Sequence, residues 1–374
     1  MIIGIPKEIK KNEYRVAITP AGVSEFVHRK HSVLVEKNAG VGSGFNDNAY
    51  VDAGATIIDD ASEIYSKAEM IYKVKEILPA EYEYMREGLL VFTYQHSNAF
   101  PEMTKYLLNS KIVGIAFEDI IDANGEFPLL RPMSEIAGMG GFIAAVTHSQ
   151  SINGGNGTLL AKIHGMRAPV VSIIGAGAAG VGAAELAASF GNHVILLDID
   201  LDKLQQLKYK LPDNMELLYS NRENLQHCLK VSDVLINCLL WPKTRTDHLV
   251  CRDDLQLMKP GAIIVDVSCD EAGAIETCHS TTHDDPVYQV SGITHYCVDN
   301  IPSAFSATAT VSLANTTLPY ALAMADKGYE QALKDDSGLR RGLTFYFGKM
   351  TLQETSEKLA IPYDSPEQVL GMMD

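Results

Sequence analysis

The stretch PVVSIIGAGAAGVGAAELAASFGNHVILLDID, residues 169–200, decides the fold of this 374-residue chain. Its apolar run at 170–174 predicts a buried strand, and the Ala-rich run that follows predicts a helix. Gly175, Gly177 and Gly180 lie between the two with G-x-G-x-x-G spacing, and Asp198 closes the next apolar run. Because an acidic residue about 20 residues beyond the glycines completes this pattern, the stretch predicts the first βαβ unit of a doubly wound α/β domain.

Such a unit binds dinucleotides, and each part of the motif has a physical task. The glycines let the backbone approach a pyrophosphate, which lies on the positive N-terminus of the helix. Asp198 would accept hydrogen bonds from the adenosine ribose hydroxyls and repel a 2′-phosphate. We therefore expect NAD as the cofactor rather than NADP. The alternative is that the small residues serve only helix packing.

Alternating strands and helices extend in both directions from this stretch. Strands are predicted at 1–6, 31–38, 56–59, 70–76, 89–96 and 112–119, and again at 215–220, 233–240, 262–268 and 294–300. Helices are predicted at 19–30, with Thr19 as N-cap, and at 46–55, 61–68, 79–88, 101–111, 222–232, 252–261 and 306–336. This alternation predicts two parallel sheets, each covered on both faces.

Ionisable residues follow successive strands of the N-terminal series. Arg15 comes shortly after the first strand, Lys75 lies in YKVKE, His96 in TYQHS and Glu118 in IAFED. Ligands of parallel sheets bind at the carboxyl ends of the strands. One such residue is weak evidence, and His96 alone would be read as a strand-end residue bonded to a loop. The four together predict a charged crevice.

Composition narrows the class of protein. A formal net charge of −16 without a dense basic cluster argues against a nucleic-acid partner. The first residues, MIIGIPKEIKKNE, lack the apolar core of a signal peptide, and the apolar stretch 170–191 is explained better by the glycine motif than by a membrane span. Six cysteines without a C-x-x-C pair indicate reduced thiols, so we expect a cytoplasmic protein without a membrane partner.

Several stretches, in order along residues 1 to about 320, resemble the alanine dehydrogenase family, which is related to the NAD-binding subunit of transhydrogenase. They are IGIPKEIKKNEYRVAITPAGV, KVKE, FTYQH, PLLRPMSEIAG, SIIGAGAAGVGAAELA, LLDID, MKPGAIIVDVSCD and YCVDNIP. The resemblance implies two Rossmann-like domains joined by a long helix. The catalytic domain would be discontinuous, 1–128 and 307–374, with the NAD domain at 129–306 between its parts. It also implies a homohexamer, and no metal.

The resemblance further implies roles for individual residues. Arg15 and Lys75 would hold the substrate carboxylate and keto oxygen, and His96 and Asp270 would form the acid/base pair. A histidine suits that task because its ordinary pKa lies near neutrality. Besides the three glycines, the implied cofactor contacts are Ser134, Ala178, Ala179, Asp198, Lys203, Ser220, Leu239, Leu240, Val267, Ser268, Cys269, Asp270, Val298, Asp299, Asn300 and Ile301.

The chain departs from the family's usual sequence near these positions. Met139 and His279 replace arginines, His164 lies in KIHGM where a Val-Pro-Gly-Val turn is usual, and Asp299 replaces an alanine. The segment VDNIPS resembles a pattern of saccharopine dehydrogenase. Asp299 has two interpretations: it caps the following helix, or it enters the cleft and recognises a polar group of a substrate larger than alanine.

The main hypothesis is NAD-dependent oxidative deamination of L-alanine to pyruvate and ammonia. Three alternatives stay open: a related amino-acid or opine-type dehydrogenase with a larger substrate, a transhydrogenase-like NAD-binding subunit, and an NAD-binding chain that has lost turnover. The histidine in TYQH argues against the transhydrogenase alternative, because such subunits typically lack it.

Overall fold

The computed structural model describes residues 1–242, 245–269 and 273–372, and it divides the chain into two compact units. The first unit contains Met1–Met133 and Ser306–Asp374, and the second contains Ser134–Phe305. The sequence analysis places the corresponding boundaries after residues 128 and 306. The first of the structural boundaries falls inside helix α5 (Arg131–His148).

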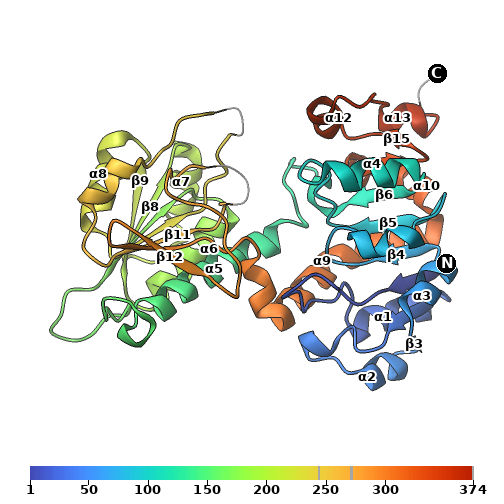
Figure 1. Cartoon of the computed structure of the whole chain (residues 1–374), viewed down its shortest axis with the longest axis horizontal. Coiled ribbons are helices and arrows are strands. Elements are labelled where there is room, and N and C mark those ends of the chain that lie inside the picture. The colour runs from blue at the N-terminus through green and yellow to red at the C-terminus, as the bar shows by residue number, and fades with distance from the viewer. Residues whose placement is uncertain (243–244, 270–272, 373–374) are drawn as a thin grey trace. The chain divides into compact units, whose positions relative to one another are not determined.

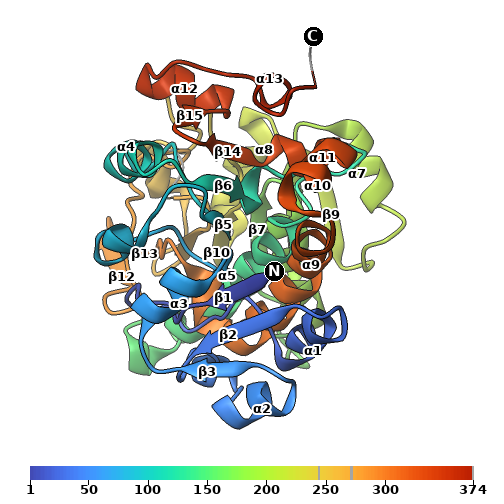
Figure 2. The same cartoon turned by 90° about the vertical axis from the view of Figure 1, so that its right-hand side faces the viewer.

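The first unit is built on an eight-stranded sheet with the order β15-β14-β6-β5-β4-β1-β2-β3 (Figures 1 and 2). Its strands are β1 (Ile2–Ile5), β2 (Ser32–Glu36), β3 (Thr56–Ile58), β4 (Met70–Tyr72), β5 (Leu90–Thr93), β6 (Val113–Ala116), β14 (Leu343–Tyr346) and β15 (Lys349–Met350). The six strands β1 to β6 are parallel and have the 3-2-1-4-5-6 order of doubly wound folds.

Helices cover this sheet on both faces, with α3 and α4 on one side and α1 and α9 on the other (Figure 2). The helices are α1 (Pro20–His28), α2 (Asp47–Asp52), α3 (Ala61–Lys67), α4 (Pro101–Asn109), α9 (Ser306–Lys327), α10 (Tyr329–Asp335), α11 (Ser337–Arg341), α12 (Gln353–Leu359) and α13 (Pro366–Val369), with short 3₁₀ turns η1 (Val41–Ser43), η2 (Pro79–Tyr84) and η3 (Phe117–Asp119). The predicted cap of α1 is confirmed, because the Thr19 side chain accepts a hydrogen bond from Gly22 N at 3.3 Å.

The second unit repeats the strand order on a seven-stranded sheet, β12-β13-β11-β10-β7-β8-β9. Its strands are β7 (Val170–Ile174), β8 (His193–Asp198), β9 (Met215–Tyr219), β10 (Val234–Asn237), β11 (Ile263–Asp266), β12 (Val287–Val290) and β13 (Ile293–Tyr296). Its helices are most of α5, α6 (Ala178–Ser189), α7 (Leu201–Leu207) and α8 (Arg222–Val231), with 3₁₀ turns η4 (Ser151–Asn153), η5 (Arg252–Leu257) and η6 (Ile301–Phe305). The predicted fold class, two α/β units on parallel-dominated sheets, is confirmed.

Three sequence-based predictions of helices were wrong in detail. The segments 79–88 and 252–261 form only the short 3₁₀ turns η2 and η5. The helix predicted at 306–336 is broken at Gly328, whose φ of +80° is left-handed, so α9 ends at Lys327 and α10 begins at Tyr329.

Three antiparallel strands were not predicted. β12 pairs with β13, and β14 pairs with both β6 and β15. β14 and β15 are joined by Phe347 and Gly348, both at positive φ, which is the geometry of a tight hairpin turn. β12 and β15 are edge strands and β14 is the second strand from the edge, so the parallel centre of each sheet is unchanged.

No helix in the described part of the chain has the length and apolar character needed to cross a bilayer. All six cysteines are described, and no disulfide joins any of them.

Candidate functional site

The first unit gathers its ionisable residues at the carboxyl ends of β1, β4, β5 and β6. Arg15 lies in the connection that follows β1, Lys75 follows β4, His96 follows β5 and Glu118 lies in η3 directly after β6. Thr93 Oγ1, at the end of β5, donates a hydrogen bond to Lys75 O at 2.7 Å. The predicted grouping at one edge of the sheet is therefore what the first unit shows.

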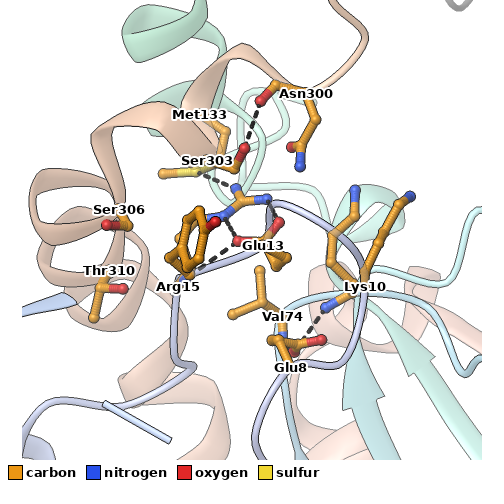
Figure 3. A network of polar contacts seen from close by, with 12 residues as sticks. Glu8, Lys10, Glu13, Arg15, Val74, Met133, Asn300, Ser303, Ser306 and Thr310 are labelled. Carbon is orange, nitrogen blue, oxygen red and sulfur yellow. Dashed lines mark hydrogen bonds and ion pairs between the residues drawn. The ribbon is translucent and has the colours of Figure 1, made fainter. Parts of the chain in front are cut away.

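Arg15 is held by Glu13, two residues before it. The guanidinium donates from Nε to Glu13 Oε1 at 2.7 Å and from Nη2 to Oε2 at 2.6 Å, while Nη1 lies 3.2 Å from Met133 Sδ (Figure 3). The Arg15 side chain is only 3% exposed. Burial opposes its charge, but the charge and hydrogen bonds of Glu13, together with Tyr94 and Glu8, raise the pKa of Arg15 overall. The fork is thus rigid and charged.

Lys75 sits among other charges in the loop after β4. Its Nζ lies 3.8 Å from Glu76 Oε2, and Glu76 also accepts a hydrogen bond from Lys10 Nζ at 2.7 Å. Burial lowers the pKa of Lys75, and the positive charges of Arg15 and Lys10 act in the same direction. A lysine in this setting releases a proton more readily than one at the surface.

The loop that carries Lys75 is fixed by a buried carboxylate. Glu8 Oε1 accepts hydrogen bonds from Val74 N at 2.6 Å and from Lys75 N at 3.1 Å (Figure 3). Glu8 also faces Lys73 Nζ at 3.6 Å, and Lys73 in turn donates to Glu81 at 2.7 Å. These buried ion pairs set the position of the loop backbone and so of Lys75.

His96 is 34% exposed and faces Glu118, with 3.9 Å between Nδ1 and Oε1. The ring of Tyr94 lies nearly parallel to the imidazole, at 11° and with 5.9 Å between centroids. Burial raises the pKa of Glu118 to about 8, and the neighbouring Asp119 adds to this shift. The histidine therefore stands beside a carboxyl group that titrates close to neutral pH.

In the second unit the glycine motif forms a tight strand-to-helix turn. Gly175 has φ +96°, and Gly177 is the N-cap of α6. A Cβ on Gly180 would lie 1.8 Å from Gly175 O, whereas a Cβ on Gly177 would meet no atom within 4 Å. Gly180 therefore has no room for a side chain, and the positive φ of Gly175 disfavours one there. Gly177 leaves open space at the N-terminus of α6, with Ala178 and Ala179 in the first turn.

Asp198, the last residue of β8, connects this turn to its neighbours. Its carboxylate accepts hydrogen bonds from Ala176 N at 2.7 Å and Asp200 N at 2.9 Å, and Lys203 Nζ lies 3.6 Å away. Ser220, just after β9, donates its N–H to Asp198 O at 2.9 Å. Gly175, Asp198, Lys203 and Ser220 thus meet at one edge of the sheet.

The other predicted cofactor residues of this unit also follow strand ends. Leu239 and Leu240 follow β10, residues 267–269 follow β11, and residues 298–301 follow β13. Ser134 lies in the first turn of α5. Gly138, one turn further along α5, packs closely on α6: a Cβ on Gly138 would lie 1.8 Å from the backbone oxygen of Ala179. Val298 and Ile301 are almost fully buried, whereas Leu240 is 63% exposed. Asp270 lies outside the described residues.

Sequence reasoning missed four residues that shape these edges. Glu13 and Met133 contact Arg15, and Tyr94 stacks on His96. Asp266, the last residue of β11, is buried and accepts a hydrogen bond from Asn237 Nδ2 at 2.8 Å; burial raises its pKa to about 7. Its place at a strand end is the same signal that identified Asp198, so it was available in the sequence.

Comparison with known proteins identifies the family to which the sequence is similar. Residues 4–137 match the family described as alanine dehydrogenase/PNT, N-terminal domain, and residues 141–353 match the corresponding C-terminal domain. The chain is 43% identical over 372 residues to an alanine dehydrogenase of Methanococcus maripaludis, covering 99% of this chain and 100% of that protein. It is also 43% identical to an alanine dehydrogenase of Bacillus subtilis, covering 99% of this chain and 98% of that protein.

Solved structures agree. An L-alanine dehydrogenase superposes with a TM-score of 0.92 at 38% identity, covering 96% of this chain and 99% of the other. A transhydrogenase from Sinorhizobium meliloti has a TM-score of 0.80 at 22% identity, covering 94% and 98% of the two chains, and shows a shared fold.

Proposed function

We propose, on the premise that this chain belongs to the alanine dehydrogenase family, that it catalyses the reversible NAD-dependent oxidative deamination of L-alanine to pyruvate and ammonia. The observation that carries the proposal is the grouping of Arg15, Lys75 and His96 at the carboxyl ends of neighbouring parallel strands. A cationic fork, a second cation and an imidazole are the groups that a 2-keto acid or amino acid requires.

Arg15 and Lys75 are proposed to bind the substrate. The Arg15 guanidinium, which Glu13 holds on its Nε–Nη2 side, is proposed to bind the substrate carboxylate. Lys75 is proposed to hold the keto oxygen, where its lowered pKa favours proton donation as charge develops on that oxygen. Met133 Sδ, against Nη1, would border the space for the small side chain of alanine.

His96 is proposed as the acid/base group, together with Asp270. In the deamination direction His96 would accept a proton from the water that adds to the substrate carbon, pass it to the amino group, and accept the hydroxyl proton as ammonia leaves. The reverse direction runs the same transfers backwards. Glu118 beside Nδ1 favours the use of Nε2 for this proton transfer.

NAD is the proposed cofactor, and the second unit fits it. The turn at Gly175 and Gly180 excludes side chains, Gly177 leaves space at the N-terminus of α6, and the Asp198 carboxylate is anchored beside the turn. When bound, NAD supplies the hydride acceptor for the substrate carbon. The second unit would act as the NAD-binding domain, and the first, with its 306–374 segment, as the catalytic domain.

One assay panel tests the proposal: NADH oxidation in the presence of ammonia and a series of 2-keto acids, repeated with NADPH. Turnover with pyruvate and NADH, ahead of longer keto acids, is the expected result. A higher rate with a longer or polar keto acid would establish the related-dehydrogenase alternative instead. NADH binding without turnover on any keto acid would point to a chain that has lost the reaction or to a transhydrogenase-like subunit.

Assembly and location belong to the same proposal. We expect a homohexamer in a cytoplasmic setting, as the sequence resemblance implies. Light scattering of the purified protein tests the first: a monomeric mass near the 40.8 kDa of one chain would reject it. Cell fractionation tests the second.

A further inference from the structure

His96 has a backbone conformation that is uncommon for residues other than glycine. Its φ is +47°, in the left-handed region that disfavours a side chain with a Cβ. Such outliers persist only where the surrounding structure holds them, and they concentrate at functional sites. The residue that holds His96 is therefore of interest for the proposed reaction.

The Glu118 carboxylate holds it. Oε1 accepts hydrogen bonds from Gln95 N at 2.9 Å and from His96 N at 2.5 Å, and Oε2 lies 3.2 Å from Gln95 N. The register of the sheet explains this placement, since Thr93 of β5 pairs with Ala116 of β6. Residues 95 and 118 each lie two positions beyond that pair, so the turn after β5 meets η3.

Glu118 also faces the imidazole. The 3.9 Å from Oε1 to Nδ1 is an ion-pair distance and exceeds that of a hydrogen bond. Tyr94 stacks along the ring, and its own hydroxyl is anchored on Leu129 O at 2.6 Å. The carboxyl group on the Nδ1 side and the stacked ring together restrict the orientation of the imidazole and direct Nε2 away from Glu118.

We propose that Glu118 is the positioning residue of His96: it fixes the left-handed turn through two backbone N–H groups and sets the protonation of the imidazole through its charge at Nδ1. This inference rests on the proposed function, in which His96 is the acid/base group.

The charge of the Glu118 carboxyl group beside His96 depends on several neighbouring groups. Burial and Asp119, the next residue of η3, raise the pKa of Glu118, whereas the N–H groups of residues 95 and 96 lower it. Tyr94 is the titratable neighbour on the β5 side, and Arg341 and Glu354 act on Asp119 from the C-terminal segment. The charge of Glu118 thus changes close to neutral pH, and Glu118→Gln removes it.

The test compares Glu118→Gln with Glu126→Gln. The amide keeps an oxygen that accepts from the backbone but carries no charge, while Glu126 is an exposed carboxylate of the same connection. Glu118→Gln is expected to lower kcat about tenfold and to move the pH limb of kcat roughly one unit lower, with the KM for NADH unchanged. Glu126→Gln is expected to match the unchanged protein. Glu118→Ala, which also removes the backbone acceptor, should lower kcat about 10²-fold.

A second readout does not depend on turnover. Carbethoxylation of His96 by diethyl pyrocarbonate, followed by peptide mass spectrometry over a pH series, reports the fraction of unprotonated imidazole. In Glu118→Gln the reactive form should appear roughly one pH unit lower than in the unchanged protein. The same His96 titration in both proteins would overturn the inference, even if kcat falls. The shift without turnover on any keto acid would support the positioning role and reject the proposed function.

Discussion

Two loops occupy the same place in the two sheets: one follows β1 and leads to α1, and the other follows β7 and leads to α6. The β7 loop is short, residues 175–177, and brings the backbone of Gly175 close to the first turn of α6, where Gly180 has no room for a side chain. The β1 loop runs from residue 6 to residue 19 and carries Glu8, Lys10, Glu13 and Arg15. The same strand order thus carries a close-packed glycine turn in the second unit and a network of buried charges in the first. The loops, and not the strand order, therefore determine the chemistry of each unit.

The largest expected effect separates the two units by function. His96→Ala should lower kcat by about 10² to 10⁴-fold, the usual contribution of a general acid or base. NADH affinity should remain, because the cradle for the cofactor lies in the other unit. Fluorescence titration with NADH, beside steady-state kinetics, measures both. Lost NADH affinity at unchanged kcat would make His96 a binding or structural residue.

The second effect tests the close packing of the first turn of α6 against the β7 loop. Gly180→Ala would place a Cβ 1.8 Å from Gly175 O, so backbone must shift, and we expect a loss of about 1 to 3 kcal/mol in unfolding free energy. Gly177→Ala is the matched control, since its Cβ meets nothing within 4 Å and its φ of −76° suits alanine. It should keep its stability in urea denaturation and weaken NADH binding. Equal stability of both variants would contradict this account of the turn.

A third effect concerns the groups that contact buried carboxylates in each unit. Glu8 and Glu13 of the first unit lie beside Lys73 and Arg15, whereas Asp266 of the second is bonded to Asn237, with no cation contacting it in the described residues. Burial raises the pKa of Asp266 from an ordinary value near ~4 to about 7. Between these two pKa values Asp266 binds more protons in the folded state than in the unfolded state. The contribution of Asp266 to the free energy of unfolding therefore falls as pH rises.

The free energy of unfolding should decline between about pH 4 and pH 7 because of Asp266, and Asp266→Asn should reduce this decline by on the order of a few kcal/mol. Urea midpoints at several pH values measure it. An unchanged pH dependence in the variant would show that Asp266 titrates normally.

The sequence predicted the parts of the molecule that local patterns determine. The βαβ unit around Gly175, the Thr19 cap and the strand ends that carry Arg15 and His96 follow from spacing and periodicity. The Glu118 contact to the His96 backbone does not, because it depends on the register between β5 and β6. The antiparallel strands β12, β14 and β15 were not predicted either, since such short runs acquire strand structure only by pairing with a neighbour.

A smaller effect is expected at Asp198, where the cofactor specificity would reside. Asp198→Ala removes the carboxylate proposed to face the ribose, so the preference for NADH over NADPH should narrow, mainly through weaker NADH binding. It also removes the acceptor for Ala176 N, so some loosening of the glycine turn is expected in the same variant. Ratios of kcat/KM for the two cofactors measure the change. Equal turnover of the unchanged protein with both cofactors would reject this role.

The smallest effect is expected at Asp299, which bears on substrate choice. Its backbone N–H donates to Thr281 O at 3.3 Å, its side chain is exposed, and within the described residues that side chain makes no hydrogen bond or ion pair. The capping interpretation lacks a bond to the following turn, η6, and the substrate interpretation requires a polar group that alanine does not have. An exposed carboxylate costs little to leave unpaired, so we expect Asp299→Ala to change stability by less than about 0.5 kcal/mol. The order of activity over a series of 2-keto acids should also stay the same, with pyruvate first. A gain on pyruvate together with a loss on a longer polar keto acid would instead assign Asp299 to the substrate and identify a larger amino acid as the substrate of this enzyme.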